Sequence, residues 1–261
     1  MYHYQVIDAF TDVPFRGNPA AVFILERPYD SAWAQNVAAE FNLAETAFAL
    51  PIADDTWDLR WFTPEVEVDL CGHATLATAH VLAAQGHSGP FRFATRSGIL
   101  TVSETDNMLW MDFPSEPPER MEADTDIQAA LGAPVLGAWK GATGDILVEL
   151  PDEHTVRMLQ PNLEKIASIP ARGVIVTAPA TDEHDFISRF FAPAVGVPED
   201  PVTGSAHTVL APFWAERLNR SHLRGFQSSR RGGTVHIRIE KPGRVLLGGN
   251  AVSVMAGTFN A

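Results

Sequence analysis

The chain has 261 residues, of which 46% are hydrophobic and 20% are charged, and it carries a formal net charge of −13. Phosphate neutralisation needs a basic face, so this charge balance argues against a nucleic-acid partner. Nothing in the composition indicates disorder, and the length accommodates one large domain or two of moderate size.

The sequence also carries few signals of targeting, membrane insertion or disulfide formation. The first residues begin directly with a strand-like pattern and lack a basic, apolar leader, so we expect no signal peptide. No stretch approaches the roughly 18 apolar residues of a membrane span, and we therefore expect a cytoplasmic protein with no membrane partner. Cys71 is the single cysteine, which excludes a disulfide framework and a zinc site built from cysteines.

The first part of the chain alternates strands with two helices. Asp30 and Ser31 are suited to cap a helix that Asn42 ends. Residues 72–84 are small and apolar on nearly all faces, which predicts a buried helix. Strands are predicted over residues 4–10, 20–25, 47–50, 57–62, 91–94, 98–103 and 108–113.

Residues 114–119 form the best linker candidate, because two adjacent prolines with polar neighbours cannot continue a helix or a central strand. The pattern then starts again, which predicts an N-terminal domain over residues 1–115 and a C-terminal domain over residues 119–249. A last strand near residues 250–261 is expected to return to the first domain. Mixed strands with one central helix in each half indicate an α+β fold. In this part we predict helices over residues 126–131, 163–168 and 204–214 and strands over residues 145–149, 173–177, 186–191, 234–239 and 244–248.

An internal repeat supports two related halves. Residues 62–68 and 191–197 both read Phe-x-Pro-x-Val-x-Val, and each run leads through a loop to a Gly-x-Ala sequence that opens a buried helix, at Gly72 and Gly204. The second loop is three residues longer. Free N–H groups and the dipole at such a helix start attract an anion. Two such helix ends facing each other would form a cleft lined with donors.

Polar residues gather at these two helix starts. His73, Asp200, Thr203 and Ser205 could each be a cap or a satisfied core residue, but their equivalent positions in a duplicated fold favour a site. Glu45 lies in a nearly uncharged stretch, where desolvation would raise its pKa toward the range useful for proton transfer. A capping or surface role is the alternative for Glu45, and composition does not decide between the two.

Several other classes of site are not indicated. Residues 141–145 lack the full Gly-x-Gly-x-x-Gly of a dinucleotide-binding turn, and no phosphate-binding loop or His-Glu-x-x-His pair is present. Ser205 lacks the flanking glycine of a hydrolase nucleophile. Residues 183–185 are interpreted as a solvated polar turn. The basic cluster at residues 220–231 is interpreted as a solvated loop and strand edge, with an anion site as the alternative.

Seven short segments carry a resemblance to a known family. They occur in order from the first predicted strand to residue 233, so the resemblance covers essentially the whole chain. The segments are Asp8-Ala9-Phe10, Gly17-Asn18-Pro19-Ala20-Ala21-Val22, Glu45-Thr46-Ala47-Phe48, Phe62-Thr63-Pro64, Cys71-Gly72-His73-Ala74-Thr75, Glu199-Asp200-Pro201-Val202-Thr203-Gly204-Ser205-Ala206 and Gln227-Ser228-Ser229-Arg230-Arg231-Gly232-Gly233. Together they resemble the phenazine-biosynthesis-like (PhzF) family, which has the diaminopimelate epimerase-like fold.

This resemblance implies two similar domains, each a mixed, barrel-like sheet wrapped around a central helix, with the site in the cleft between them. It also implies a homodimer and cofactor-independent isomerisation of a small carboxylate, similar to that of trans-2,3-dihydro-3-hydroxyanthranilate. No cofactor and no metal are expected. By resemblance, Glu45 carries the proton, whereas the polar substituents are held by His73, Asp200 and Ser205. The substrate-binding residues expected are Asn18, Gly72, Ala74, Thr203 and Gly204, with the two glycines presenting backbone donors to the carboxylate.

The single cysteine separates this chain from the related epimerases, which use two thiols. Cys71 occupies one of the two thiol positions, but Thr203 stands at the matching turn of the second half. A hydroxyl is a poor proton carrier at neutral pH, so two-thiol racemisation is not expected. Two alternatives stay open beside the isomerase: a one-base racemase or epimerase using Cys71, and a non-catalytic protein that binds a small carboxylate.

Overall fold

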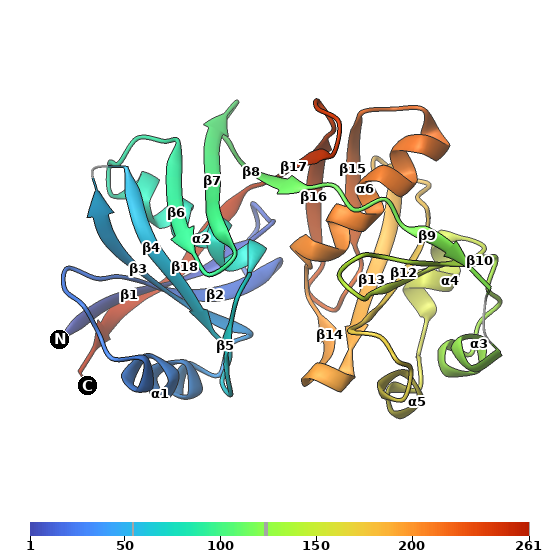
Figure 1. Ribbon diagram of the computed structural model, residues 1–261, viewed down its shortest axis with the longest axis horizontal. Helices are drawn as coiled ribbons and strands as arrows, with labels where there is room; N and C mark the ends of the chain where they lie inside the picture. The colour runs from blue at the N-terminus through green and yellow to red at the C-terminus, as the bar shows by residue number, and fades with distance from the viewer. Residues whose placement is uncertain (54, 123–124, 261) are drawn as a thin grey trace. The chain divides into compact units, whose positions relative to one another are not determined.

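The computed structural model describes residues 1–53, 55–122 and 125–260. The chain forms two compact units, Met1–Asp112 with Gly248–Ala261 (unit 1) and Phe113–Leu247 (unit 2), so that unit 2 is inserted in the sequence of unit 1. The elements are labelled in Figure 1. None of the helices in the described part of the chain is long and apolar enough to span a membrane.

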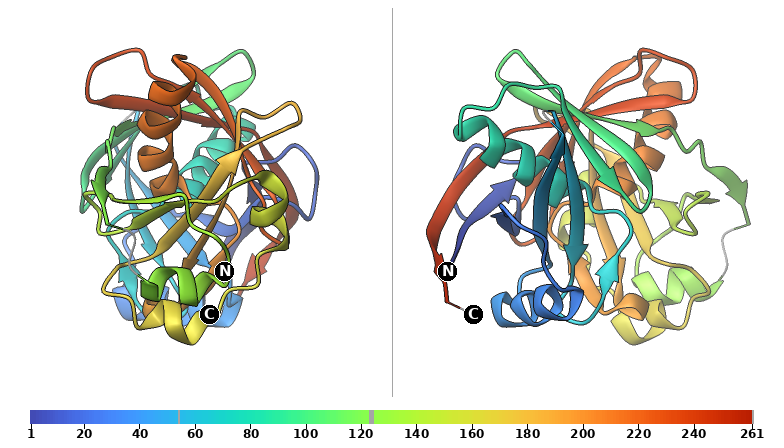
Figure 2. Two further views of the ribbon diagram at one scale, coloured as in Figure 1. Left: turned by 90° about the vertical axis from the view of Figure 1, so that its right-hand side faces the viewer. Right: turned by 60° about the vertical axis from the view of Figure 1, so that its left-hand side comes forward.

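Unit 1 is built on a mixed sheet in which β18 and β2 pair with β1, and β3, β4, β6, β7 and β8 follow in that order. A short strand, β5, pairs with β4. Figure 2 shows β1 and β18 side by side. The strands are β1 (Tyr2–Ala9), β2 (Asn18–Ile24), β3 (Glu45–Ala53), β4 (Thr56–Phe62), β5 (Glu67–Val68), β6 (Phe91–Thr95), β7 (Gly98–Thr105), β8 (Met108–Pro114) and β18 (Ala251–Phe259).

Two helices complete unit 1, and both start where the sequence predicts. Helix α1 (Ser31–Phe41) is capped by the Asp30 side chain, which accepts from the Ala32 N–H, and it ends at Asn42 in the left-handed region. Helix α2 (Gly72–Ala84) buries nine of its 13 residues and packs against β1, β2 and β3. Since both faces of α2 are apolar, it forms the centre of the unit rather than its surface.

Unit 2 also has strands of mixed direction and a second central helix, α6 (Gly204–Leu218). Aromatic rings fasten α6 to the sheet: Trp214 stacks on Phe186 of β13, and Phe213 contacts Trp139 of β10. The other elements are β9 (Glu119–Met121), α3 (Thr125–Leu131), β10 (Gly137–Lys140), β11 (Ile146–Glu149), α4 (Glu153–Met158), α5 (Leu163–Ala167), β12 (Val174–Pro179), β13 (Phe186–Ala192), η1 (Pro193–Val195), β14 (Val197–Asp200), β15 (His222–Gln227), β16 (Gly233–Arg238) and β17 (Arg244–Gly249).

The two units repeat the same strand pairings. In unit 1, β1–β2 is antiparallel, β2–β3 parallel, β3–β4 antiparallel, β4–β6 parallel and β6–β7 antiparallel. In unit 2 the same sequence of pairings runs through β10–β11, β11–β12, β12–β13, β13–β15 and β15–β16. Helix α2 follows β5 and precedes β6, as α6 follows β14 and precedes β15. The α+β fold of two similar halves, each with a central helix, is therefore confirmed.

The strand register corrects the predicted alignment of the repeat. Trp61 pairs with Val68 in unit 1, and Phe190 pairs with Asp200 in unit 2. The three additional residues of unit 2 therefore lie before Glu199, where the chain forms η1, and not between β14 and α6. Glu199 is thus the counterpart of Glu67.

A shared ion pair supports this corrected alignment. Arg60 holds Glu67 with two hydrogen bonds of 2.7 Å. Arg189 holds Glu199 in the same way, at 2.7 and 3.1 Å. Each arginine also lies over the ring of a phenylalanine two residues later in its own strand. The pair fixes the chain just before each central helix in both units.

Several elements of unit 2 were not predicted or are longer than predicted. Strands β10, β14 and β15 were not predicted, and α6 continues through Pro212 to Leu218, beyond the predicted end at Trp214. A proline inside a helix leaves the carbonyl four residues earlier without its donor. Here the Thr208 carbonyl accepts instead from the backbone N–H of Glu116, at 3.0 Å, so the helix tolerates the proline.

Candidate active site

The site residues predicted in unit 1 meet at the first turn of α2. Glu45 is the first residue of β3, and His73 is the second residue of α2. A Glu45 carboxylate oxygen lies 3.2 Å from Nε2 of His73, and the two side chains are 19% and 5% exposed. Glu45 is therefore mostly withdrawn from water but still reachable.

Asn18 contacts the other ring nitrogen of His73, at 3.2 Å from Nδ1. The preceding Gly17 has φ +64°, and a Cβ on it would lie 2.1 Å from the Ala9 carbonyl oxygen, so only glycine allows this turn. The loop before it is fastened by Asp8, which accepts from the Phe15 N–H at 2.7 Å. The backbone thereby sets Asn18 at the first position of β2, beside the buried histidine.

The hydrogen bonds assign the proton of His73. The Asn18 amide nitrogen can only donate, so Nδ1 accepts and the proton lies on Nε2, facing Glu45. Burial lowers the pKa of His73 to about 3, so the ring is neutral at physiological pH. The contact is therefore a hydrogen bond from a neutral imidazole to a carboxylate rather than an ion pair.

Cys71, Gly72 and Ala74 surround His73 at the helix start. Cys71 is the N-cap residue, and its Sγ lies 3.5 Å from Nδ1 and 4.0 Å from Nε2 of His73. Gly72 is the first residue of the helix, and the side chain of Ala74 is fully buried. Gly72 and Ala74 can therefore contact a ligand through their backbone N–H groups, which have no acceptor within the helix.

The site residues predicted in unit 2 form a second group at the start of α6. Thr203 Oγ1 donates to Asp200 Oδ2 at 2.6 Å, and Thr203 is the N-cap residue before Gly204. Gln227, fully buried, accepts from the Thr203 N–H at 2.9 Å and donates to its hydroxyl at 3.0 Å and to the Asp200 carbonyl at 2.8 Å. Sequence reasoning placed Gln227 only in a family segment and gave it no role.

Ser205 belongs to a further set of contacts that the sequence did not reveal. Arg172 donates to Ser205 Oγ at 2.9 Å and, through Nε, to Asp145 Oδ1 at 3.0 Å, with a second contact to Asp145 Oδ2. Asp145 is fully buried; burial raises its pKa, and the guanidinium of Arg172 opposes that rise. The Arg172 side chain is 37% exposed. The pair thus holds the Ser205 hydroxyl at the helix start.

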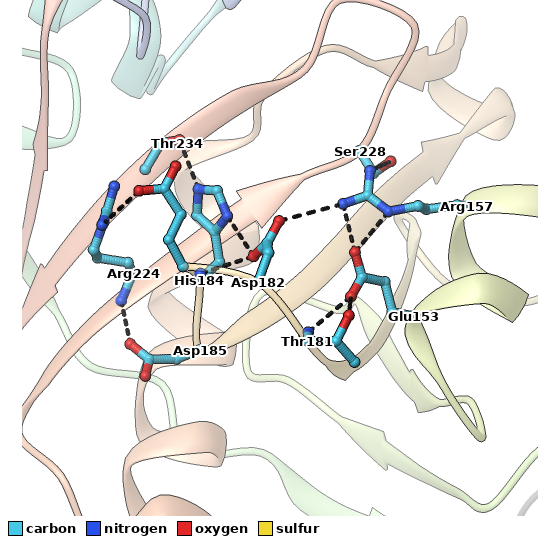
Figure 3. Close-up of polar contacts among 10 residues, drawn as sticks. Glu153, Arg157, Thr181, Asp182, His184, Asp185, Arg224, Ser228 and Thr234 are labelled. Carbon is cyan, nitrogen blue, oxygen red and sulfur yellow. Dashed lines mark hydrogen bonds and ion pairs between the residues drawn. The ribbon is translucent and has the colours of Figure 1, made fainter.

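The polar turn at residues 183–185 takes part in an ion-pair network that is largely exposed to solvent (Figure 3). His184 uses both ring nitrogens, with Asp182 at 2.9 Å and Thr234 at 3.1 Å. Arg224 binds Glu183 at 3.2 Å, and Arg220 pairs with Asp185. Glu153 joins the same network through Arg157 and Thr181. Because these charges neutralise one another, we assign the network to the stability of unit 2 and not to an anion site.

Comparison with known proteins agrees with this arrangement. Residues 7–257 match the sequence model of the family described as phenazine biosynthesis-like protein, PhzC-PhzF. The chain is 47% identical over 255 residues to an uncharacterized isomerase of Halalkalibacterium halodurans, covering 96% of this chain and 95% of the relative. It is 46% identical to an uncharacterized isomerase of Pseudomonas aeruginosa, covering 97% of each chain.

Solved structures extend the comparison. A PhzF-family protein of Enterococcus faecalis superposes with a TM-score of 0.94 at 42% identity, covering 98% of each chain. A hydroxyproline epimerase of Agrobacterium vitis superposes with a TM-score of 0.64 at 9% identity, covering 98% of this chain and 91% of that one. The second likeness concerns the fold alone, and it is the epimerase-like fold that the sequence motifs implied.

Proposed function

Because the chain belongs to the phenazine biosynthesis-like (PhzC-PhzF) family and is an isomerase, we propose that it isomerises a small cyclic or amino-acid-like carboxylate by proton transfer, without a cofactor. The reaction is similar to the isomerisation of trans-2,3-dihydro-3-hydroxyanthranilate that the sequence resemblance implies. The family assignment itself confirms the one made from the sequence motifs.

The observation that carries this proposal is the Glu45–His73 contact of 3.2 Å at the start of α2. Glu45 takes a proton from one substrate carbon, becomes a neutral carboxylic acid and returns the proton to a second carbon. A neutral His73 donates to the carboxylate and keeps it oriented between the two steps. The partial exposure of Glu45 gives the substrate access, and the buried neighbours limit proton loss to water.

The other predicted residues receive supporting roles in the same proposal. Asp200 and Ser205 hold polar substituents of the substrate, and Gly72 and Gly204 offer backbone donors to its carboxylate. Thr203 has both its N–H and its hydroxyl engaged by Gln227 and Asp200, so we propose that it orients Asp200 rather than binding substrate first-hand. Asn18 orients His73, and Ala74 contributes only its backbone.

The test starts from a ligand screen. Cyclic amino acids and anthranilate-like acids are ranked by thermal shift, and each hit is incubated with the protein in heavy water while proton exchange at carbon is followed by NMR. We expect exchange with the wild-type protein and a loss of about 100-fold or more in Glu45→Gln, the usual range for a lost general base. Glu40→Gln, which changes an exposed glutamate of α1, is the matched control. Unchanged exchange in Glu45→Gln would refute the role of Glu45.

A one-base racemase that uses Cys71 is the second candidate, favoured by the 3.5 Å distance between Cys71 Sγ and Nδ1 of His73. A Cys71→Ala variant with full exchange activity removes this candidate. Tight binding of a carboxylate without any exchange would instead indicate the non-catalytic protein.

By family resemblance we also propose a cytoplasmic homodimer. Light scattering of the purified chain measures its mass, and a monomer at working concentration would contradict the proposal.

A further inference from the structure

Glu45, Cys71 and His73 offer a carboxylate oxygen, a sulfur and a ring nitrogen that all lie within 4.8 Å of one another. Counting cysteines argued against a zinc site, because one thiol cannot build a site made of cysteines. A site of mixed ligands is a different case, because the start of β3 and the first turn of α2 bring three different ligand types to one point. Cys71 and His73 are 6% and 4% exposed, so this is not a chance meeting of surface groups.

The ligand types fit one class of cation. Thiolate, imidazole and a single carboxylate together suit Zn²⁺ and similar thiophilic divalent ions, whereas Mg²⁺ and Ca²⁺ require several oxygen ligands. The charges also balance, since one thiolate and one carboxylate neutralise a divalent cation while the imidazole stays neutral. Neutrality matters here because an uncompensated charge in so buried a place would be costly.

The distances are close to those of a tetrahedral site. Zinc bonds of about 2.0–2.1 Å to nitrogen and oxygen and about 2.3 Å to sulfur imply edges of roughly 3.4 Å between nitrogen and oxygen and roughly 3.6 Å between nitrogen and sulfur. Nε2 of His73 lies 3.2 Å from the Glu45 carboxylate and 4.0 Å from Cys71 Sγ. The Glu45 oxygen and Cys71 Sγ lie within 4.8 Å of each other, so the thiol must turn toward the carboxylate to complete three corners, and the fourth is left for water.

Asn18 supplies the outer support that such a site needs. A metal on Nε2 requires the ring proton to move to Nδ1, which then donates outward. The Asn18 amide lies 3.2 Å from Nδ1, and turning it over presents its oxygen as the acceptor. The same side chain therefore serves the metal-free and the metal-bound tautomer of His73.

We propose that Glu45, Cys71 and His73 form an inhibitory binding site for Zn²⁺ or a similar thiophilic divalent cation. The cation binds the Glu45 oxygen, Cys71 Sγ and His73 Nε2, and the thiol proton leaves to solvent. Binding of the cation at these three side chains does not depend on the proposed isomerase activity. Inhibition rests on the proposed function, because the cation occupies the carboxylate that would otherwise carry the substrate proton.

Cobalt(II) serves as the spectroscopic probe in the full-length, chelator-treated protein, because a thiolate ligand gives a sulfur-to-cobalt charge-transfer band in the near ultraviolet. We expect the band to appear at one equivalent of Co²⁺ and to vanish when Zn²⁺ is added. Cys71→Ser should abolish the band and weaken Zn²⁺ binding, measured by calorimetry, by roughly 100-fold, because the softest ligand is lost. His73→Gln and Glu45→Gln should weaken binding of both ions.

His80→Gln is the matched control, since His80 lies on the same helix outside the group. Circular dichroism confirms that each variant is folded, and Cys71→Ala replaces Cys71→Ser if the latter unfolds. No band with excess Co²⁺, or a band that persists in the folded Cys71 variant, overturns the metal site. Absence of substrate exchange in the metal-free wild type contradicts the proposed function alone, and exchange that proceeds in the presence of bound Zn²⁺ overturns the inhibition.

Discussion

The starts of α2 and α6 share the same backbone arrangement but carry different side chains. In both, a bidentate arginine–glutamate pair fixes the incoming strand, an N-cap residue precedes a glycine, and the fifth residue of the motif bonds back to the N-cap carbonyl. That bond joins Thr75 to the Cys71 carbonyl at 2.6 Å in α2 and His207 to the Thr203 carbonyl at 2.8 Å in α6. The two starts differ in their own residues, with Cys71 and His73 in one and Thr203 and Ser205 in the other, and in the residue at the start of β3 and just before β12.

The position of Glu45 has a counterpart in unit 2 that carries no side chain. The Leu25 N–H bonds to Ala49 and the Leu150 N–H to Thr177, so Glu45 and Gly173, each four residues earlier than its acceptor, are counterparts. A Cβ on Gly173 would lie 2.4 Å from the ring of Phe190. Packing thus denies unit 2 any side chain at the place of Glu45. The duplicated backbone keeps the glycine at the helix start in both units, and packing leaves room for a carboxylate at this position in unit 1 only.

The largest effect is expected from placing a side chain at Gly173. Gly173→Ala should lower the free energy of unfolding by about 3 kcal/mol, because the buried Phe190 ring must move. Urea denaturation measures the loss. The double variant with Phe190→Leu should be less destabilised than the sum of the single changes. Additive losses would show that Phe190 is not what excludes the side chain.

Lowering the pH should reduce the free energy of unfolding through His207, the buried histidine at the start of α6. Burial lowers the pKa of His207 to about 4, against an ordinary value of 6.5. Above pH 6.5 neither state binds the proton, and stability is full. As the pH falls from 6.5 to 4, the unfolded chain takes up a proton that the folded chain refuses, so stability drops by up to about 3 kcal/mol.

Urea titrations at pH 7.5, 5.5 and 4.5 measure this loss, and His207→Gln, which cannot titrate, should lose less between the same values. Equal losses in the variant and the wild type would contradict the assignment. The other shifted histidines, such as His73, contribute equally to both proteins and cancel in the difference.

Removing the guanidinium from the second helix start should cost somewhat less. Arg172→Met leaves Asp145 buried without its cation and should destabilise unit 2 by about 2 kcal/mol, below the cost for a fully buried pair because Arg172 is 37% exposed. Adding Asp145→Asn should recover part of the loss in thermal unfolding. If the single and double variants unfold at the same temperature, the two side chains do not act as a pair.

The smallest effect is expected at the arginine–glutamate pair that both units contain. Arg60→Lys and Arg189→Lys each replace a planar, two-bond contact with a point charge and should each cost about 1 kcal/mol. Chemical denaturation of the two variants side by side makes the comparison. Markedly unequal losses would indicate that the two pairs are not equivalent parts of a repeated frame.

Local signals in the sequence predicted much of this fold. The caps Asp30 and Asn42 marked α1, and the small, apolar runs after Gly72 and Gly204 marked both central helices, because these features depend on neighbouring residues alone. The repeat was visible for the same reason. Its alignment was wrong by the three residues before Glu199, since only strand pairing shows where η1 departs from the sheet.

The residues of the candidate site also fall into two groups, those that the sequence predicted and those that it did not. Glu45 and His73 carried a chemical signal of their own, and motif resemblance placed them together. Arg172 and Asp145 carried none, because they are 27 residues apart and meet only through the register of β11 and β12. Aligning the repeat on Glu45 would have directed attention to Gly173 and its neighbour, which is the signal that could have found Arg172.

The pairing of β1 with β18 has a consequence for synthesis on the ribosome. Tyr2 and Phe259 are partners in that pairing, so unit 1 is not complete until the strand Ala251–Phe259 has left the exit tunnel. Unit 2, a continuous segment, is fully synthesised before that. The half that carries Glu45 is therefore the last to close.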